Sequence, residues 1–198
     1  MAEGAVPEDG GPVDGGLVDG GPGDSAARER LRALVDAWPG VPAFVHDRHL
    51  TVVVSNAIAR ALTPNFREGM NLARSTFLDP EVARTQPGWQ ALAGQVAGSL
   101  RESLDENDAD DAFRSIVGEL SAHSRSFSEA WADESGPTEP TGSCLFPHRV
   151  VGDMHLAFHR LRPPGQTDDT MVAWRPVDDA SARSLAMLAE LVTGGSEA

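Results

Sequence analysis

Two histidines are the residues of this chain whose spacing comes closest to that of a metal site. His155 and His159 stand four residues apart, and on a helix that spacing would bring two imidazoles to one ion. Their segment alternates apolar and polar residues, which predicts a strand, and four strand residues span about 13 Å. Zinc–nitrogen bonds of about 2.1 Å cannot bridge that distance. We therefore expect no metal site.

Nucleophilic and acid–base chemistry has equally little support. Cys144 has no recognisable base near it in the sequence and lies in a Ser- and Gly-rich approach to a predicted strand. The carboxylates of residues 105–111 are better explained as a solvated joint between two helices. The sequence contains no phosphate-binding glycine loop and no HExxH, GxSxG or CxxC motif. We expect neither an enzyme nor a bound cofactor.

The stretch STFLDPEVARTQPGWQ, residues 75–90, places large apolar side chains between helix-breaking residues. It predicts that residues 71–90 cover an apolar cavity on the concave face of the sheet, with Pro80 and Pro87 setting the direction of the chain. The alternative is that Phe77, Leu78 and Trp89 only fill the core, as most buried aromatic residues do. The residues alone leave both readings open.

Predicted strands supply the other residues expected around that cavity. Asn56 follows an apolar strand, so its amide could orient a ligand head group. It could equally serve only as the N-cap of the next helix. The expected lining residues are Phe44, Val54, Asn56, Phe77, Leu78, Trp89, Phe158 and Trp174.

Hydrophobic periodicity predicts the elements that must position these side chains. Asp24–Ser25 is a candidate N-cap, and Pro39–Gly40 stops the first helix. Apolar residues at helical spacing predict helices over 25–38, 57–62, 89–104, 113–120, 125–131 and 179–192, with Ser124 as a cap. Period-two segments predict strands at 44–45, 52–54, around 143–146, at 154–159 and at 170–177.

The order of these elements predicts an α+β fold. Two strands, a helical insert, three further strands and a final helix suit a five-stranded antiparallel sheet with one face covered by helices. That arrangement is PAS-like, and it leaves room for a small molecule between sheet and helices. We place this domain at residues 25–192, between an acidic, glycine-rich disordered tail at 1–24 and a disordered end at 193–198.

The composition excludes several classes of protein. The chain has 30 acidic and 16 basic residues, and its formal net charge of −14 opposes contact with nucleic-acid phosphates. A single cysteine excludes an internal disulfide and fits a reducing cytoplasm. No apolar run approaches the ~18 residues that a membrane helix needs, and the first residues lack the features of a secretory signal.

Several segments of the chain resemble the MmyB-like transcription regulator ligand-binding domain. The resemblance runs over about residues 31–190 and includes NLARSTFLDPEVARTQPGWQALAGQVAGSLR and DAFRSIVGELSAHSRSFSEAWA. Its most specific marks are Phe-Leu-Asp-Pro at 77–80, Pro87, Trp89, Glu119-Leu-Ser, Trp131 and Val151-Gly152.

This resemblance implies a PAS-like sensor for a small apolar or amphipathic molecule, such as an acyl-like one. Members of that family usually follow a Cro-type helix-turn-helix. Such a domain needs about 60 residues, and only an acidic tail precedes the predicted sensor here. We therefore expect no direct nucleic-acid binding. Regulation would act through a homodimer, or a heterodimer with a full-length helix-turn-helix regulator.

Two other hypotheses stay open. The first is a protein-interaction or dimerisation module with a filled core and no ligand, or the remnant of a truncated helix-turn-helix regulator. The second is an enzyme, which would require a convergent base and nucleophile inside the cavity. A ligand that stabilises the fold would separate the sensor from the interaction module.

Overall fold

A computed structural model describes residues 22–106, 109–133, 139–163 and 168–195 of the chain, and the side chains from residue 25 onward within them. The tail predicted at 1–24 lies outside these residues except for its last three positions. In chain order the elements are α1 (Pro22–Asp36), β1 (Ala43–His46), β2 (Val52–Ser55), α2 (Ala57–Leu62), the 3₁₀ helix η1 (Pro64–Phe66), α3 (Leu72–Leu78), α4 (Pro80–Thr85), α5 (Trp89–Glu106), α6 (Asp111–His123), α7 (Arg125–Ala132), β3 (Thr141–Phe146), β4 (Met154–Leu161), β5 (Thr170–Pro176) and α8 (Asp179–Gly194).

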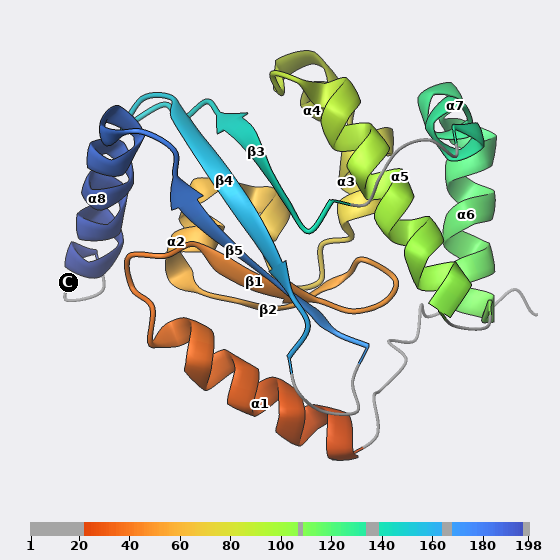
Figure 1. Cartoon of the computed structure of the whole chain (residues 1–198), viewed down its shortest axis with the longest axis horizontal. Helices are drawn as coiled ribbons and strands as arrows, with labels where there is room; N and C mark the ends of the chain where they lie inside the picture. Colours follow the sequence, from red (N-terminus) through yellow and green to blue (C-terminus); the bar gives the residue numbers. More distant parts are fainter. Residues whose placement is uncertain (1–21, 107–108, 134–138, 164–167, 196–198) are drawn as a thin grey trace, which may run out of the picture.

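The strands form one antiparallel sheet in the order β2-β1-β5-β4-β3, which confirms the predicted α+β, five-stranded arrangement (Figure 1). Phe44 of β1 pairs with Val172 of β5, and Phe158 of β4 pairs with Trp174 of β5. Because side chains of a strand alternate between the faces of the sheet, these four residues share one face. We call it the inner face.

The β1–β2 connection is a tight turn at the predicted place. The Asp47 carboxylate accepts hydrogen bonds from the backbone N–H groups of His49 and Thr51, both at 2.9 Å. Leu50 takes a positive φ of 63° within this turn. Such a conformation is costly for a leucine, so the carboxylate contacts and the burial of the side chain must hold it.

Helix α1 covers the other, outer face of the sheet at β1 and β2. Leu31 and Val35 pack there with Val45, Val54 and Met171. The helix begins at Pro22, so the prediction of an N-cap at 24–25 was wrong. Proline is favoured in the first turn of a helix because its fixed φ is already helical.

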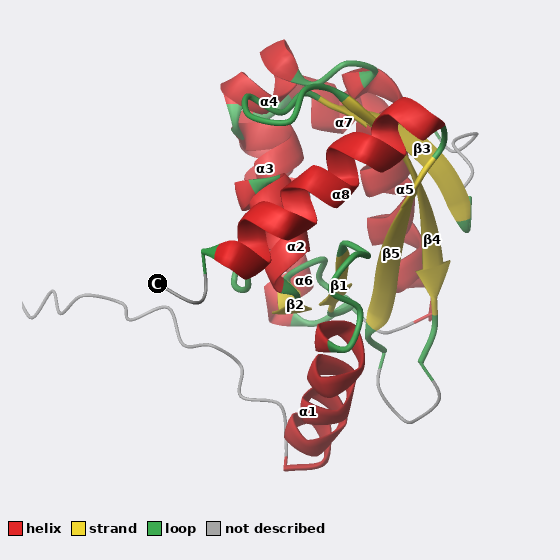
Figure 2. Cartoon of the chain, turned by 90° about the vertical axis from the view of Figure 1, so that its left-hand side faces the viewer, coloured by secondary structure: helices red, strands yellow, loops and turns green. Residues whose placement is uncertain are grey.

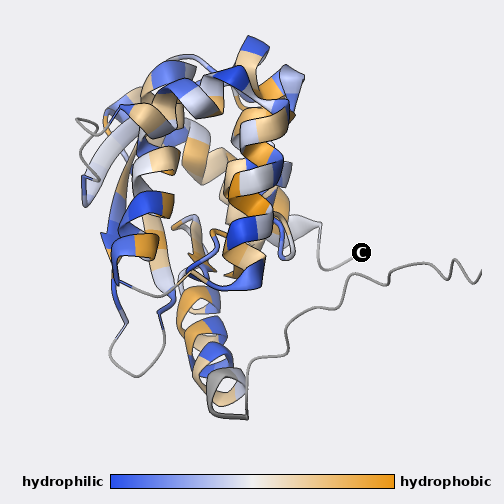
Figure 3. Ribbon diagram, turned by 90° about the vertical axis from the view of Figure 1, so that its right-hand side faces the viewer, coloured by the Kyte–Doolittle hydropathy of each residue, from blue (hydrophilic) through white to orange (hydrophobic). Residues whose placement is uncertain are grey.

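The inner face is covered by the helical insert, as predicted. Helices α3, α5, α6 and α7 share a core of their own, in which Leu100, Leu120 and Phe127 are fully buried. Ser124 accepts a hydrogen bond from Phe127 N at 3.1 Å, which confirms its predicted role as the cap of α7. Figure 3 shows apolar and polar residues alternating along these helices, as expected for helices with one buried face.

Helix α8 packs against α2, β4 and β5, away from α1 (Figure 2). Asp178 caps it by accepting from Ser181 N at 2.8 Å, and Leu185 and Leu188 point into the core of the inner face. The helix continues to Gly194, so residues 193–194 do not belong to a disordered end, and 196–198 lie outside the described residues. Among the described helices, none is long and apolar enough to span a bilayer.

Candidate functional site

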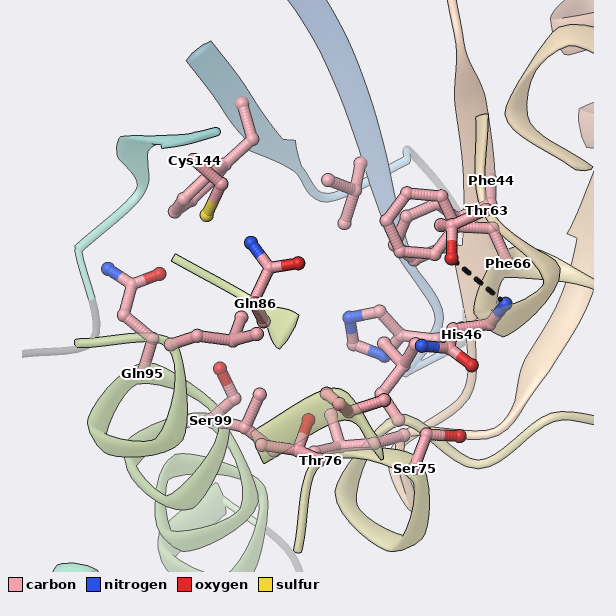
Figure 4. A pocket seen from close by; sticks show the side chains of 18 of the residues that line it. Phe44, His46, Thr63, Phe66, Ser75, Thr76, Gln86, Gln95, Ser99 and Cys144 are labelled. Carbon is pink, nitrogen blue, oxygen red and sulfur yellow. Dashed lines mark hydrogen bonds between the residues drawn. The ribbon is translucent and has the colours of Figure 1, made fainter. Parts of the chain in front are cut away.

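A cavity of about 130 Å³ lies between the inner face of the sheet and the helices that cover it (Figure 4). That is far more than the ~10–15 Å³ that one water needs. Its walls come from four of the five strands, β1, β3, β4 and β5, and from η1, α3, α4 and α5. The lining residues are Phe44, His46, Leu50, Thr63, Asn65, Phe66, Leu72, Ser75, Thr76, Val82, Gln86, Leu92, Gln95, Val96, Ser99, Cys144, Phe146, Phe158, Arg160, Val172 and Trp174.

One end of the cavity is a cluster of aromatic rings. Phe66 lies with its ring centroid 4.4 Å from that of Phe44 and 5.8 Å from that of Trp174. Phe146 and Phe158 contact the indole edge-on, with centroid distances of 4.9 and 5.3 Å. Such offset and edge-on contacts are favourable beyond simple burial, so this end is a closely packed apolar surface.

Gln86, at the end of α4, closes another part of the wall. Its Nε2 atom donates to the backbone oxygen of Leu145 at 2.8 Å, which ties the helical insert to β3. Figure 4 shows Gln86, Gln95, Ser99 and Thr76 around the space, so the helical side of the cavity offers amide and hydroxyl groups. This side differs in polarity from the aromatic side formed by the sheet.

His46 is the buried titratable group of the cavity wall, with 5% of its surface exposed. Its Nδ1 atom lies 2.8 Å from the backbone oxygen of Asp47. A carbonyl oxygen only accepts, so Nδ1 carries the proton and Nε2 carries a lone pair. Burial lowers the pKa of this histidine from its ordinary 6.5, and the charge of Arg160 adds to that effect. The ring is therefore neutral at pH 7.

Arg160 is the only charged residue among the described residues that line the cavity. Its Nη2 atom donates to Oε2 of Glu102 on α5 at 3.0 Å, and Glu102 also lies 3.7 Å from Arg162. The guanidinium is thus already paired with a carboxylate. The pair joins β4 to α5 at one edge of the cavity.

Trp174 carries an indole N–H that has no acceptor among the described residues, although its side chain is buried. The rings of Phe66, Phe146 and Phe158 surround it. An unpaired buried donor costs about 1–3 kcal/mol.

A family model described as the MmyB-like transcription regulator ligand binding domain matches residues 27–188, which includes every strand and all the cavity residues. The chain belongs to this family. A comparison with curated proteins finds none that matches. The family consists of ligand-binding domains of regulators, which indicates a regulatory sensor role for this MmyB-like domain.

Three of the eight residues expected to line the cavity of this MmyB-like domain do so, namely Phe44, Phe158 and Trp174. All three lie on the inner face of the sheet. Val54 lies instead on the outer face, where it is fully buried under α1. The reason is the register: Val54 pairs with Val45, whereas the cavity residue Phe44 pairs with Ser55.

Asn56 is buried and all its hydrogen-bonding capacity is used within the protein. Its Oδ1 atom accepts from Ala43 N at 3.2 Å and Ala59 N at 3.0 Å, and its Nδ2 atom donates to Val35 O at 3.0 Å and Val41 O at 2.8 Å. It is the N-cap of α2 and does not line the cavity. Of the two readings left open by the sequence, the structure supports the cap.

Phe77, Leu78 and Trp89 turn away from the cavity. Phe77 packs edge-on against Phe127 with centroids 5.1 Å apart, and Trp89 Nε1 donates to Thr76 O at 3.1 Å. They belong to the core of the helical insert and border a separate surface hollow between α3, α4 and α6. Their neighbours Leu72, Ser75, Thr76, Val82 and Gln86 face the cavity instead, so residues 71–90 do cover it, but with other side chains.

The sequence reading missed His46, Phe66, Phe146 and Arg160 in this MmyB-like domain. A signal existed for two of them. His46 stands two residues after Phe44, and Arg160 two residues after Phe158, so strand alternation places each on the same face as its predicted neighbour. Nothing in the sequence marks Phe66, which depends on the 3₁₀ turn after Pro64.

The histidines that suggested a metal site lie on the outer face, each with a partner. His155 Nε2 lies 3.1 Å from Ser143 Oγ, and Arg175 Nε donates to His159 Nε2 at 3.1 Å. No group of three metal-ligating side chains is found in the described ranges. Burial raises the pKa of Cys144, so the thiol in the cavity wall is protonated at neutral pH.

Proposed function

We propose that this MmyB-like domain binds a small apolar or amphipathic molecule in the cavity between sheet and helices. The observation that carries the proposal is the cavity itself, open enough for more than a single water and lined on one side by aromatic rings. An acyl-like molecule suits an apolar floor with polar groups on the opposite wall.

The packing of α8 supports a route from the cavity to the surface. Leu185 and Leu188 of α8 belong to the same core cluster as Phe158 and Trp174, whereas the apolar residues of α1 form a separate cluster on the outer face. A ligand that shifts the aromatic rings would therefore change the packing of α8 first. Such a ligand would act by favouring one of two pre-existing arrangements.

The outer surface of α8 supports a contact with a partner. Met187 and Leu191 are 51% and 52% exposed and lie four residues apart, on one side of the helix. We propose that this side takes part in a dimer, with a second copy or with a regulator that carries a helix-turn-helix. The net charge of −14 favours readout by such a partner over direct contact of this chain with DNA.

A ligand-free interaction module is the second candidate, and one observation favours it. The rings of Phe44, Phe66, Phe146, Phe158 and Trp174 already fill much of the inner face with mutual contacts. If these rings and the adjacent helices close the remaining space in solution, the domain would have no ligand and α8 would be its functional surface.

Thermal and chemical unfolding with a panel of acyl compounds tests the sensor proposal. A compound at 100 times its Kd adds about 2.7 kcal/mol to the free energy of unfolding. Ser99→Leu fills part of the cavity and should abolish that gain. Ser115→Leu makes the same change on the exposed side of α6 and serves as the control. Mass spectrometry of the native protein would identify a molecule that co-purifies.

Two negative results together would contradict the sensor proposal. If no panel member stabilises the protein and no small molecule is extracted from it, the ligand-free module is the better description.

A further inference from the structure

The lone pair on His46 Nε2 has no hydrogen-bond partner among the described residues. The single hydrogen bond of this side chain is the one from Nδ1 to Asp47 O, at 2.8 Å. Figure 4 shows the imidazole projecting from β1 into the cavity. An unpaired acceptor that faces a largely apolar cavity forms a strong contact with any donor that reaches it.

The tautomer determines which chemistry can pair with Nε2. Since Nδ1 donates to a carbonyl, a neutral ring presents only an acceptor to the cavity. Burial disfavours the imidazolium form, which could instead donate from Nε2. A ligand group beside Nε2 must therefore supply a hydrogen.

The charges of the wall argue against an anionic ligand group. Arg160 would be the natural partner of a carboxylate, but it already donates to Glu102 at 3.0 Å. A carboxylate placed in the cavity would lose its hydration, and the charge of Arg160 is already paired with that of Glu102. It would also bring only acceptor oxygens to Nε2.

We propose that the ligand of this cavity is uncharged and carries a hydroxyl or amide N–H that donates to His46 Nε2. This inference rests on the proposed sensor function and narrows its ligand class. The apolar body extends from His46 past Phe44 and Val172 toward Trp174. His46 pairs with Thr170, and Trp174 stands four residues further along β5, about 13 Å away. An amphipathic chain with a donor at one end suits this path.

Two isomers test the assignment without any change to the protein. 1-Octanol and 1-methoxyheptane have the same atoms, but only the alcohol has a hydrogen to donate. Titration calorimetry at pH 7.5 should give a Kd for the alcohol roughly three- to tenfold lower than for the ether, the range of one hydrogen bond. Octanoate, which is anionic at this pH, should bind more weakly than the alcohol.

Variants of His46 assign the difference to one atom. His46→Leu should bind the two isomers equally, because its side chain cannot accept. His46→Gln keeps a side-chain oxygen in the cavity wall and should retain part of the preference. His159→Leu removes a histidine from the outer face of β4 and should behave like the unchanged protein.

Each possible result supports or contradicts a ligand that donates a hydrogen bond to His46 Nε2. Equal binding of the isomers, tighter binding of octanoate, or a preference that survives in His46→Leu would overturn the donor assignment while leaving the sensor function in place. If none of the three compounds binds, the inference fails, and the acyl panel and the extraction of a co-purified molecule decide the proposed function separately.

Discussion

The Nε2 atom of His49 lies 3.0 Å from both carboxylate oxygens of Asp110, and this contact joins the β1–β2 turn to the start of α6. Arg48 donates to the same carboxylate, and Asp110 also accepts from Phe113 N at 2.7 Å. One side chain thus caps a helix and fixes the helical insert against the sheet. The cavity lies between these two parts, so this contact helps to set its width.

Replacing Asp110 separates its two roles. Asp110→Ala removes both the cap and the charge and should lower the free energy of unfolding by about 1–2 kcal/mol. Asp110→Asn keeps a good capping residue and should cost less than about 1 kcal/mol, because partly exposed ion pairs contribute little. Urea unfolding at pH 7 measures both. Equal losses in the two variants would contradict the capping role.

The lowered pKa of Asp110 also predicts that the fold loses stability in acid. Burial raises the pKa of this carboxylate, but hydrogen bonds from Phe113 N, His49 and Arg48 outweigh that effect and lower it from 3.8 to about 2. A lowered folded-state pKa stabilises the fold above the unfolded value. This contribution should be complete above about pH 4 and disappear between pH 3.8 and 2. A smaller loss for Asp110→Asn than for the unchanged protein over that interval would support this.

The titration of His46 should give the free energy of unfolding a second dependence on pH, at a higher pH. Burial lowers its folded-state pKa below 6.5, Arg160 adds to this, and Asp47 and Asp169 oppose it. Above pH 6.5 both folded and unfolded chains are neutral at this site. Below that pH the unfolded chain binds a proton first, so stability should fall by up to about 1.4 kcal/mol per pH unit.

Urea unfolding at pH 7.5 and 5.5 measures the contribution of His46. His46→Gln should flatten the difference between the two pH values, whereas His159→Gln on the outer face should not. A His46→Gln variant with the pH dependence of the unchanged protein would show that the ring titrates normally.

The position of Gly142, at the aromatic end of the cavity, leaves no room for a side chain. A Cβ atom at this position would lie 2.7 Å from Cε1 of Phe158, whose ring packs against Trp174 on β5 with centroids 5.3 Å apart. Gly142→Ala should therefore push the ring toward the cavity and cost about 1–3 kcal/mol. A compound that binds the unchanged protein should bind this variant more weakly.

A double-mutant cycle with Phe158→Leu tests the Gly142 contact. The smaller side chain gives the new methyl group room, so the two substitutions together should cost at least 0.5 kcal/mol less than the sum of the single losses, as coupled neighbours do. Strict additivity would mean that the methyl group meets no resistance from the ring.

Replacing Asn56 should greatly lower the free energy of unfolding without directly changing the cavity. Asn56→Ala removes the α2 cap and leaves Val35 O, Val41 O and Ala43 N without this partner, at a cost of about 2–4 kcal/mol. Asn56→Asp keeps the acceptor but loses the hydrogen bonds donated by Nδ2, so it should also destabilise the fold. An Asn56→Asp variant as stable as the unchanged protein would contradict these donor contacts.

Local patterns in the sequence were enough to predict most elements of this domain. Apolar residues at 3.6 spacing marked α5 and α6, and capping residues such as Ser124 marked where a helix begins. Alternation of apolar and polar residues over 154–159 predicted a strand, which is β4. These signals work because a helix or a strand imposes its own period, whatever surrounds it.

The side to which each apolar residue of the helical insert turns was decided by tertiary packing. Phe77 and Trp89 have the size and apolarity of lining residues, yet they face Phe127 and the core of α5–α7, while the smaller Ser75 and Thr76 face the cavity. A helix has two sides that can be buried, and its sequence does not name the neighbour on each. The same holds for Val54, whose face depends on its pairing with Val45.

The sequence by itself determined the order of the strands and of most helices, the family and the aromatic residues of β1, β4 and β5, because these follow from local periodicity and from residue identity. Only the tertiary structure decided that Asn56 is used as a cap, that Arg160 is paired with Glu102 and that His46 Nε2 faces the cavity without a partner among the described residues. Those relations join residues far apart in the chain. They depend on how the sheet and the helical insert are placed against each other, which no local pattern records.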